Sequence, residues 1–185
     1  MWKSRELALV ILLAVVSFVY SVLVSQLPNL ITGIMGLTYF FIIGHAIFVS
    51  FGLLMYGGRR WRFLLQSTLV AILLIPTFQH GTPFDVLART PILASSFFAD
   101  LIFNSVYPFF HKHNKMIWWA ILSAVGFLLL NPFFTMLNMF LFYSPEALSS
   151  YVTVYLLLFP VTMIEAIFGG IIAHRIWRRV QQTSK

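Results

Sequence analysis

An aspartate stands near the middle of an apolar segment that is long enough to cross a lipid bilayer. The segment runs from Pro91 to Phe110, and the aspartate is Asp100. The hydrocarbon layer of a bilayer is about 30 Å thick and takes roughly twenty helical residues. A carboxylate at its centre costs about 2.5–3.5 kcal/mol on insertion scales. We therefore expect Asp100 to face protein or water, not lipid.

The polar side chains of this segment follow a helical spacing. Ser96, Asp100, Asn104 and Tyr107 fall on one side of a helix and form a continuous polar stripe. Ionisable residues inside a membrane mark functional sites by default. Two interpretations are open: a ligand site in a helix bundle that includes Asp100 and Asn104, or a structural carboxylate that is hydrogen-bonded to neighbouring helices.

The composition is typical of a polytopic membrane protein. Of the 185 residues, 60% are hydrophobic and 9% are charged, whereas soluble domains contain about 25% charged residues. The sequence predicts an all-α fold in a single domain, residues 1–185, with six transmembrane helices joined by short loops. The predicted spans cover about 7–27, 37–56, 63–78, 91–110, 116–143 and 151–174.

The distribution of positive charge predicts the orientation of these spans. With six crossings, every lysine and arginine except Arg89 falls on one side of the membrane. By the positive-inside rule this side is cytoplasmic. Both termini are then cytoplasmic, and we expect the chain in the cell membrane. All five tryptophans lie at the same interface, where their rings favour the level of the lipid headgroups.

The sequence lacks the motifs of several classes of enzyme and binding protein. It has no cysteine, which excludes disulfides and cysteine-ligated metal. It contains no Walker Gly-x-x-x-x-Gly-Lys-Ser/Thr motif, no His-Glu-x-x-His and no Gly-x-Ser-x-Gly. The net charge of +7 lies in clusters beside apolar spans, which does not favour nucleic-acid binding. We expect no enzymatic activity, no metal site and no cofactor.

Polar groups in other spans are predicted to meet Asp100 in one cavity that opens to the outside. His45 lies near the midplane in the second span, and Glu165 lies somewhat inward in the sixth. Two carboxylates without a buried lysine or arginine favour a neutral or cationic solute, provided that both are ionised. His45 has a second interpretation, as a hydrogen-bonded packing residue.

The fifth span is predicted to contribute a polar side to the same cavity. Asn131, Thr135 and Asn138 lie at offsets of four and seven residues, which places them on one helical face. Pro132 is predicted to interrupt this helix. It frees a backbone carbonyl, which is tolerated in a membrane where protein or water can satisfy it.

Two further patterns each have a structural and a functional interpretation. Asp85 and Arg89 lie four residues apart before the fourth span, as either an exposed ion pair or a contact to a solute at the cavity mouth. Ser17, Ser21 and Ser25 recur at every fourth position of the first span. Such a ridge of small residues lets another helix approach closely, either to dock a partner or in ordinary bundle packing.

The chain resembles the substrate-binding S component of energy-coupling factor (ECF) transporters. The resemblance covers nearly the whole chain and rests on Asp100 in span four, the polar positions of spans five and six, and an ending of Glu165-Ala-Ile-Phe-Gly169-Gly170-Ile-Ile-Ala173 with a basic tail. It implies capture of a vitamin, a vitamin precursor or a metal ion from outside. It also implies association with a transmembrane T component and ATPase subunits.

The resemblance is incomplete in the first span. Family members commonly carry Ala-x-x-x-Ala there for docking, whereas this chain has Ala8 and Ala14 six residues apart together with the serine ridge. Two other functions stay open. In a non-transporting membrane scaffold of a cell-envelope complex, Asp100 and Glu165 would only tie helices together. A small secondary transporter is the other alternative, although no internal repeat of the kind found in many such folds is evident.

Overall fold

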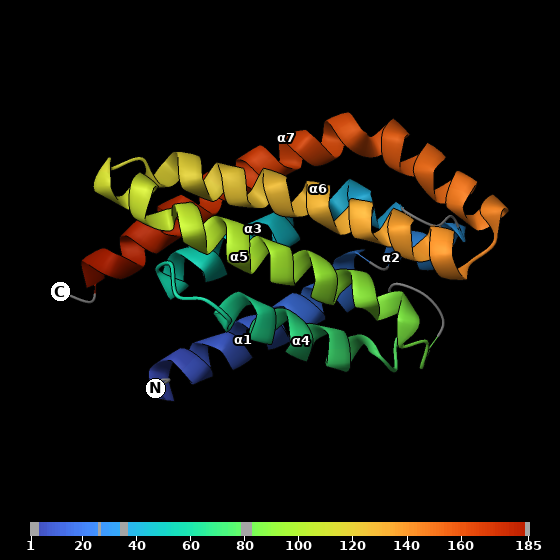
Figure 1. The fold of residues 1–185 in the computed structure, drawn as a ribbon, viewed down its shortest axis with the longest axis horizontal. Helices are drawn as coiled ribbons and strands as arrows, with labels where there is room; N and C mark the ends of the chain where they lie inside the picture. The colour runs from blue at the N-terminus through green and yellow to red at the C-terminus, as the bar shows by residue number, and fades with distance from the viewer. Residues whose placement is uncertain (1–3, 26, 34–36, 79–82, 184–185) are drawn as a thin grey trace.

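The protein folds as a bundle of helices (Figure 1). The computed structural model describes residues 4–25, 27–33, 37–78 and 83–183, and every regular element within these ranges is helical. The prediction of an all-α fold is confirmed. Four helices are long and apolar enough to cross a membrane by length and composition, which is compatible with a multi-pass membrane protein.

The four long helices correspond to predicted spans one, four, five and six. α1 (Ser4–Tyr20) continues into a π-helical turn, η1 (Ser21–Ser25). The others are α5 (Thr90–Lys112), α6 (Met116–Phe142) and α7 (Pro145–Thr183). α7 has 39 residues and begins at Pro145, before the predicted start at residue 151. It contains Pro160 and is visibly bent in Figure 1, as expected for a helix with an internal proline.

Two further apolar helices are shorter than the predicted second and third spans. α3 (Ile43–Tyr56) follows a 3-10 turn, η2 (Leu37–Phe41), and α4 covers Arg62–Leu74. With 14 and 13 residues, these helices are about 20 Å long. η2 and α3 together cover the predicted second span, 37–56, with a break at Ile42, whereas α4 ends at Leu74, before the predicted end of the third span at residue 78. Two short elements complete the described chain, α2 (Leu27–Thr32) and the 3-10 turn η3 (Leu87–Arg89).

α6 runs unbroken through Pro132, so the predicted interruption there is wrong. A proline has no backbone N–H, and in a helix it leaves the carbonyl four residues earlier without its usual donor. That carbonyl belongs to Leu128, and the hydroxyl of Tyr155 in α7 donates to it at 3.4 Å. A neighbouring helix thus satisfies the freed group, as the sequence led us to expect.

The described basic turns gather at one end of the bundle. Figure 1 shows the two chain termini at this end, together with the α3–α4 and α5–α6 turns. The first of these turns carries Arg59 and Arg60, and the second carries Lys115. Glu6 in α1 forms ion pairs with Arg59 and, at 2.8 Å, with Arg62. These pairs join the start of α1 to the start of α4.

Small residues let α7 approach two neighbours closely. α7 packs against both α3 and α6, while α5 packs against α4 and α6. A Cβ added at Gly169 would lie 2.5 Å from the Cβ of Ala46 in α3. A Cβ added at Gly170 would lie 2.7 Å from the Cα of Ile121 in α6. Glycine at these two positions therefore sets the distance between the helices.

Gly170→Ala is expected to lower the melting temperature of the purified protein in detergent micelles. The added methyl meets backbone atoms of α6, which cannot move aside alone, and overpacking typically costs about 1–3 kcal/mol. Ser150→Ala is a matched control, because Ser150 is an exposed residue of the same helix. If both variants have the melting temperature of the wild-type protein, the close approach at Gly170 does not limit the packing of α7.

Candidate functional site

Asp100 is fully buried, and its carboxylate binds the amino end of α4. Oδ1 accepts a hydrogen bond from the backbone N–H of Trp61 at 3.0 Å, and Oδ2 accepts one from Leu64 at 2.9 Å. The side-chain amide of Asn104 also donates to Oδ1. Trp61 provides no capping side chain and holds a left-handed φ of 72°. Asp100 therefore satisfies N–H groups that a helix start leaves unpaired, which favours the structural interpretation of this carboxylate.

Arg89 binds the opposite end of α4. Its side chain is 2% exposed, and Nη2 donates to the backbone carbonyls of Leu74 at 3.2 Å and Thr77 at 2.7 Å. Nη1 donates to the backbone carbonyl of Asp85 at 2.6 Å. Leu74 is the last residue of α4. The η3–α5 segment thus supplies an anion to the amino end of α4 and a cation to its carboxyl end, as the helix dipole favours.

Glu165 of α7 caps α3 in the same way. Its Oε2 accepts hydrogen bonds from the backbone N–H groups of Ile42 at 2.7 Å and Ile43 at 3.1 Å. Ile42 is the N-cap position of α3 and has no capping side chain of its own. Glu165 is therefore engaged with the backbone of a neighbouring helix.

Asp85 joins the start of the η3–α5 segment to the end of α6. Oδ1 accepts a hydrogen bond from the N–H of Ala88 at 3.1 Å, and Oδ2 accepts one from the hydroxyl of Tyr143 at 2.6 Å. The bond from Tyr143 lowers the pKa of Asp85. Burial, together with the bond to Asp85, raises the pKa of Tyr143 to about 12. Asp85 is thus fixed in a polar contact between two helix ends.

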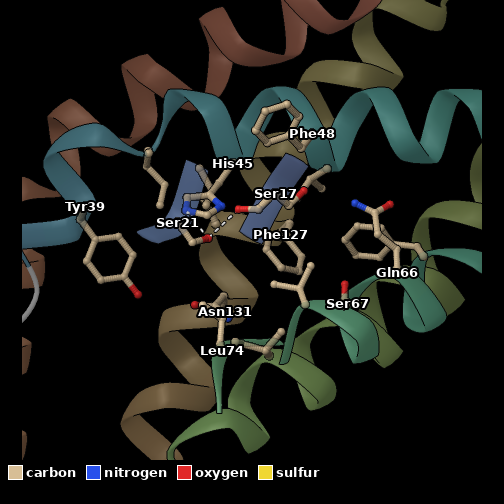
Figure 2. Close-up of a pocket in the computed structure, with 16 residues that line it drawn as sticks. Ser17, Ser21, Tyr39, His45, Phe48, Gln66, Ser67, Leu74, Phe127 and Asn131 are labelled. Atoms are coloured by element: carbon tan, nitrogen blue, oxygen red, sulfur yellow. Dashed lines mark hydrogen bonds between the residues drawn. The ribbon is translucent and has the colours of Figure 1, made fainter. Parts of the chain in front are cut away.

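A cavity of about 80 Å³ lies between α1, α3, α4 and α6. Figure 2 shows its lining, in which polar side chains face aromatic and aliphatic walls. This volume is below the roughly 300–1,000 Å³ of pockets for drug-sized ligands, so the cavity fits a molecule of a few heavy atoms. Its hydroxyl, amide and imidazole groups outside the aromatic walls belong to Ser17, Ser21, His45, Gln66, Ser67 and Asn131.

The predicted meeting of the carboxylates in one cavity is wrong. Of the predicted binding residues, His45 and Asn131 line this cavity. The side chain of Asn138 instead donates to the carbonyl of Leu87 at 3.1 Å and the hydroxyl of Thr90 at 2.9 Å. The residues predicted for the site that do not line the cavity are Asp85, Arg89, Asp100, Asn104, Thr135, Asn138 and Glu165.

The hydroxyl of Ser17 is the unsatisfied group of the cavity wall. Ser17 is 6% exposed, and its Oγ has no hydrogen-bond partner among the residues that the structure describes. The neighbouring Ser21 donates to the carbonyl of Ser17 at 2.8 Å, and its Oγ lies 3.4 Å from Nε2 of His45. A buried polar group left unsatisfied costs about 1–3 kcal/mol. Because this Oγ is closed to a water-sized molecule in the present conformation, a molecule in the cavity can exchange hydrogen bonds with it once the Ser17 side chain or its neighbours move.

Two amides give the wall a further donor and a further acceptor. Oε1 of Gln66 accepts a hydrogen bond from the hydroxyl of Tyr56 at 2.7 Å, which leaves the NH₂ group of Gln66 as a donor. Nδ2 of Asn131 donates to Ser95 at 3.3 Å, which leaves Oδ1 as an acceptor. The lining contains no aspartate, glutamate, lysine or arginine. The cavity thus offers both donors and acceptors of hydrogen bonds, and His45 is the titratable imidazole of its lining.

The serine ridge of the first span faces the inside of the bundle. Ser17 and Ser21 are 6% and 1% exposed and line the cavity, so the prediction that they form a docking surface for a partner is wrong. The side chain of Ser25 lies outside the described part of the structure. Ser17 and Ser21 therefore agree with the second interpretation, in which the ridge packs against other helices of the same bundle.

Two cavity residues, Gln66 and Ser67, were not predicted from the sequence. They lie in a Gln-Ser-Thr run, residues 66–68, inside an otherwise apolar segment. Polar residues in such a segment usually face the bundle interior, and this signal could have identified them. Among the described residues, no group of three or more His, Asp or Glu side chains is placed to hold a metal ion.

No protein-family model, curated protein or solved structure matches the chain. Its function is therefore inferred from the geometry of its own side chains.

Asp100→Asn is expected to lower the melting temperature in detergent micelles more than Glu165→Gln does. Both carboxylate oxygens of Asp100 accept hydrogen bonds from backbone N–H groups. An asparagine would place its own NH₂ group, a donor, opposite one of these N–H groups. Glu165 accepts through one oxygen, which a glutamine carbonyl can replace. Hydrogen bonds to charged groups contribute about 1.5–3 kcal/mol each. Glu146→Gln, at the exposed start of α7, is the control; equal effects of the first two variants would contradict the capping geometry.

Proposed function

We propose that this protein is a membrane-embedded solute-binding subunit of an importer, similar to the S components of ECF transporters. The observation that carries the proposal is the cavity between α1, α3, α4 and α6, whose lining includes Ser17 with its buried, unsatisfied hydroxyl. A bundle that only needed to be stable would gain from filling this space or from an alanine at position 17. An unsatisfied polar group beside a cavity, unlike one in a packed region, is a group that a ligand can complete.

The resemblance to S components supplies the proposed partners. A transmembrane T component and ATPase subunits would provide ATP hydrolysis, for which this chain has no Walker motif. Capture of a vitamin or vitamin precursor would require the helices around the cavity to separate, since the present volume of about 80 Å³ suits a smaller solute. Uptake from outside the cell is part of this proposal.

The proposed topology has six crossings of the cell membrane, with both termini in the cytoplasm. α3 and α4 are the two short crossings. Their ends would lie within a hydrocarbon layer about 30 Å thick, where backbone groups need partners inside the protein. Support comes from Asp100, Arg89 and Glu165, which bind backbone groups at the ends of these helices. The gathering of the basic turns at one end of the bundle also supports it.

Single cysteines can test this topology, because the chain contains none. Glu146→Cys in the first turn of α7 is expected to react with a membrane-impermeant maleimide added to intact cells. His113→Cys in the α5–α6 turn is expected to react only after the cells are opened. Both positions are exposed, so differences in labelling report the side of the membrane. Labelling of His113→Cys in intact cells would overturn the proposed orientation.

Ser17→Ala is expected to weaken retention of the natural solute while leaving the melting temperature of the empty protein unchanged or higher. The alanine removes an unsatisfied buried hydroxyl and with it one hydrogen bond to the ligand. The measurement is mass spectrometry of small molecules released from protein purified by mild extraction. Ser96→Ala is the matched control, because Ser96 is also buried with an unpartnered hydroxyl but does not line the cavity.

Two results would count against solute binding at this site. One is a wild-type protein that retains no small molecule under any extraction. The other is a Ser17→Ala protein that retains as much compound as the Ser96→Ala protein does.

A second candidate function is a non-transporting membrane scaffold. The observation that favours it is the use of Asp85, Asp100 and Glu165 in contacts between helices. A scaffold would release no compound on extraction, and Ser17→Ala would then stabilise it without loss of function.

A further inference from the structure

The polar groups of the cavity wall point to one class of ligand. We propose that the cavity binds an uncharged small molecule that both donates and accepts hydrogen bonds, in the class of simple amides, ureas and polyols. This inference rests on the proposed solute-binding function and narrows its substrate. It differs from the expectation drawn from the sequence, in which two carboxylates in the cavity also allowed a cationic solute.

The position of the charged side chains excludes an ionic ligand. Asp100 and Glu165 are bound to backbone N–H groups of α4 and α3, and Arg89 is bound to backbone carbonyls. None of these three side chains lines the cavity. An ion transferred from water into this space would lose its hydration and meet no carboxylate, lysine or arginine of the described lining, which is strongly unfavourable.

The hydrogen-bonding groups equally exclude a hydrocarbon. The hydroxyl of Ser17 has no partner in the described part of the chain and would stay unsatisfied beside an apolar ligand. The NH₂ of Gln66 can donate to a ligand, and Oδ1 of Asn131 can accept from one. An amide, a urea or a vicinal diol carries a donor and an acceptor within a few bonds of each other, and so can satisfy groups on several helices at once.

The cavity volume limits the ligand to a few heavy atoms. An engineered apolar cavity of about 150 Å³ accommodates benzene, whereas the present cavity measures about 80 Å³. Phe48, Phe63 and Phe127 form part of its wall and offer flat apolar surfaces to a small planar ligand (Figure 2). Acetamide, with a planar amide and one methyl group, is a suitable probe of this class.

The inference can be tested with three probes of nearly the same shape and different charge. Acetamide is neutral, acetate is an anion and acetamidinium is a cation near neutral pH, and each carries one methyl group. Saturation-transfer NMR of that methyl signal, recorded on the full chain in detergent micelles, reports binding. We expect a saturable signal from acetamide and none from the two ions. In Ser17→Ala the acetamide affinity should fall about two- to tenfold, as for the loss of one hydrogen bond.

Two further variants control for folding and for position. Ser96→Ala should bind acetamide as the wild-type protein does, because this buried serine lies outside the cavity. Asn131→Asp replaces an amide by an isosteric acid, and it should lose preference for acetamide and gain binding of acetamidinium. Its response tests the site even if Ser17→Ala fails to fold.

The outcomes separate this inference from the proposed function. A saturable, Ser17-dependent signal from acetate or acetamidinium would overturn the uncharged ligand class and leave solute binding intact. Retention of a charged compound by protein purified from cells would do the same. Acetamide binding that is unaffected in Ser17→Ala places the ligand elsewhere and overturns the inference. If no probe binds and no compound is retained, both the inference and the proposed function fail.

Discussion

Every acidic side chain of this protein lies at, or binds, the amino end of a helix. The sequence has five such residues. Glu6 and Glu146 lie in the first turns of α1 and α7, and Asp85, Asp100 and Glu165 accept backbone N–H groups at the starts of η3, α4 and α3. Unpaired N–H groups at a helix start are costly in an apolar environment, and the helix dipole favours negative charge there. α3 and α4, the two shorter apolar helices, depend on these hydrogen bonds at their amino ends.

The capping of α4 has a direct consequence for the cavity. α4 is held at one end by Asp100 and at the other by Arg89, and between these ends it presents Gln66 and Ser67 to the cavity. The charged groups therefore position the wall, and neutral groups form its polar surface. A buried, unsatisfied hydroxyl at Ser17 lowers stability, and the same group is the one most able to bind a ligand. Stability and binding are opposed at this one position.

Much of the helical architecture could be predicted, because long apolar segments and helical periodicity are local properties of the chain. The predicted fourth and fifth spans agree closely with α5 and α6, and Asp100 is buried as expected. The site could not be predicted to the same degree. Asp100 and Glu165 share a chemical type and an intramembrane position, yet each binds the backbone of a different helix. The serine ridge of the first span left two interpretations open, because small residues allow close packing against a partner as well as against helices of the same bundle.

The order of amino acids by itself determined that this chain is helical and apolar and that a carboxylate inside an apolar segment, such as Asp100, is buried against protein. These properties follow from the length of each segment and from the transfer cost of charge. Only the tertiary structure decided which group each carboxylate meets and where the cavity forms. The partners of Asp100 and Glu165 include Leu64 and Ile42, which are 36 and 123 residues away in the sequence. Helical periodicity fixes the face on which a side chain lies, but the neighbour on that face depends on how the helices pack.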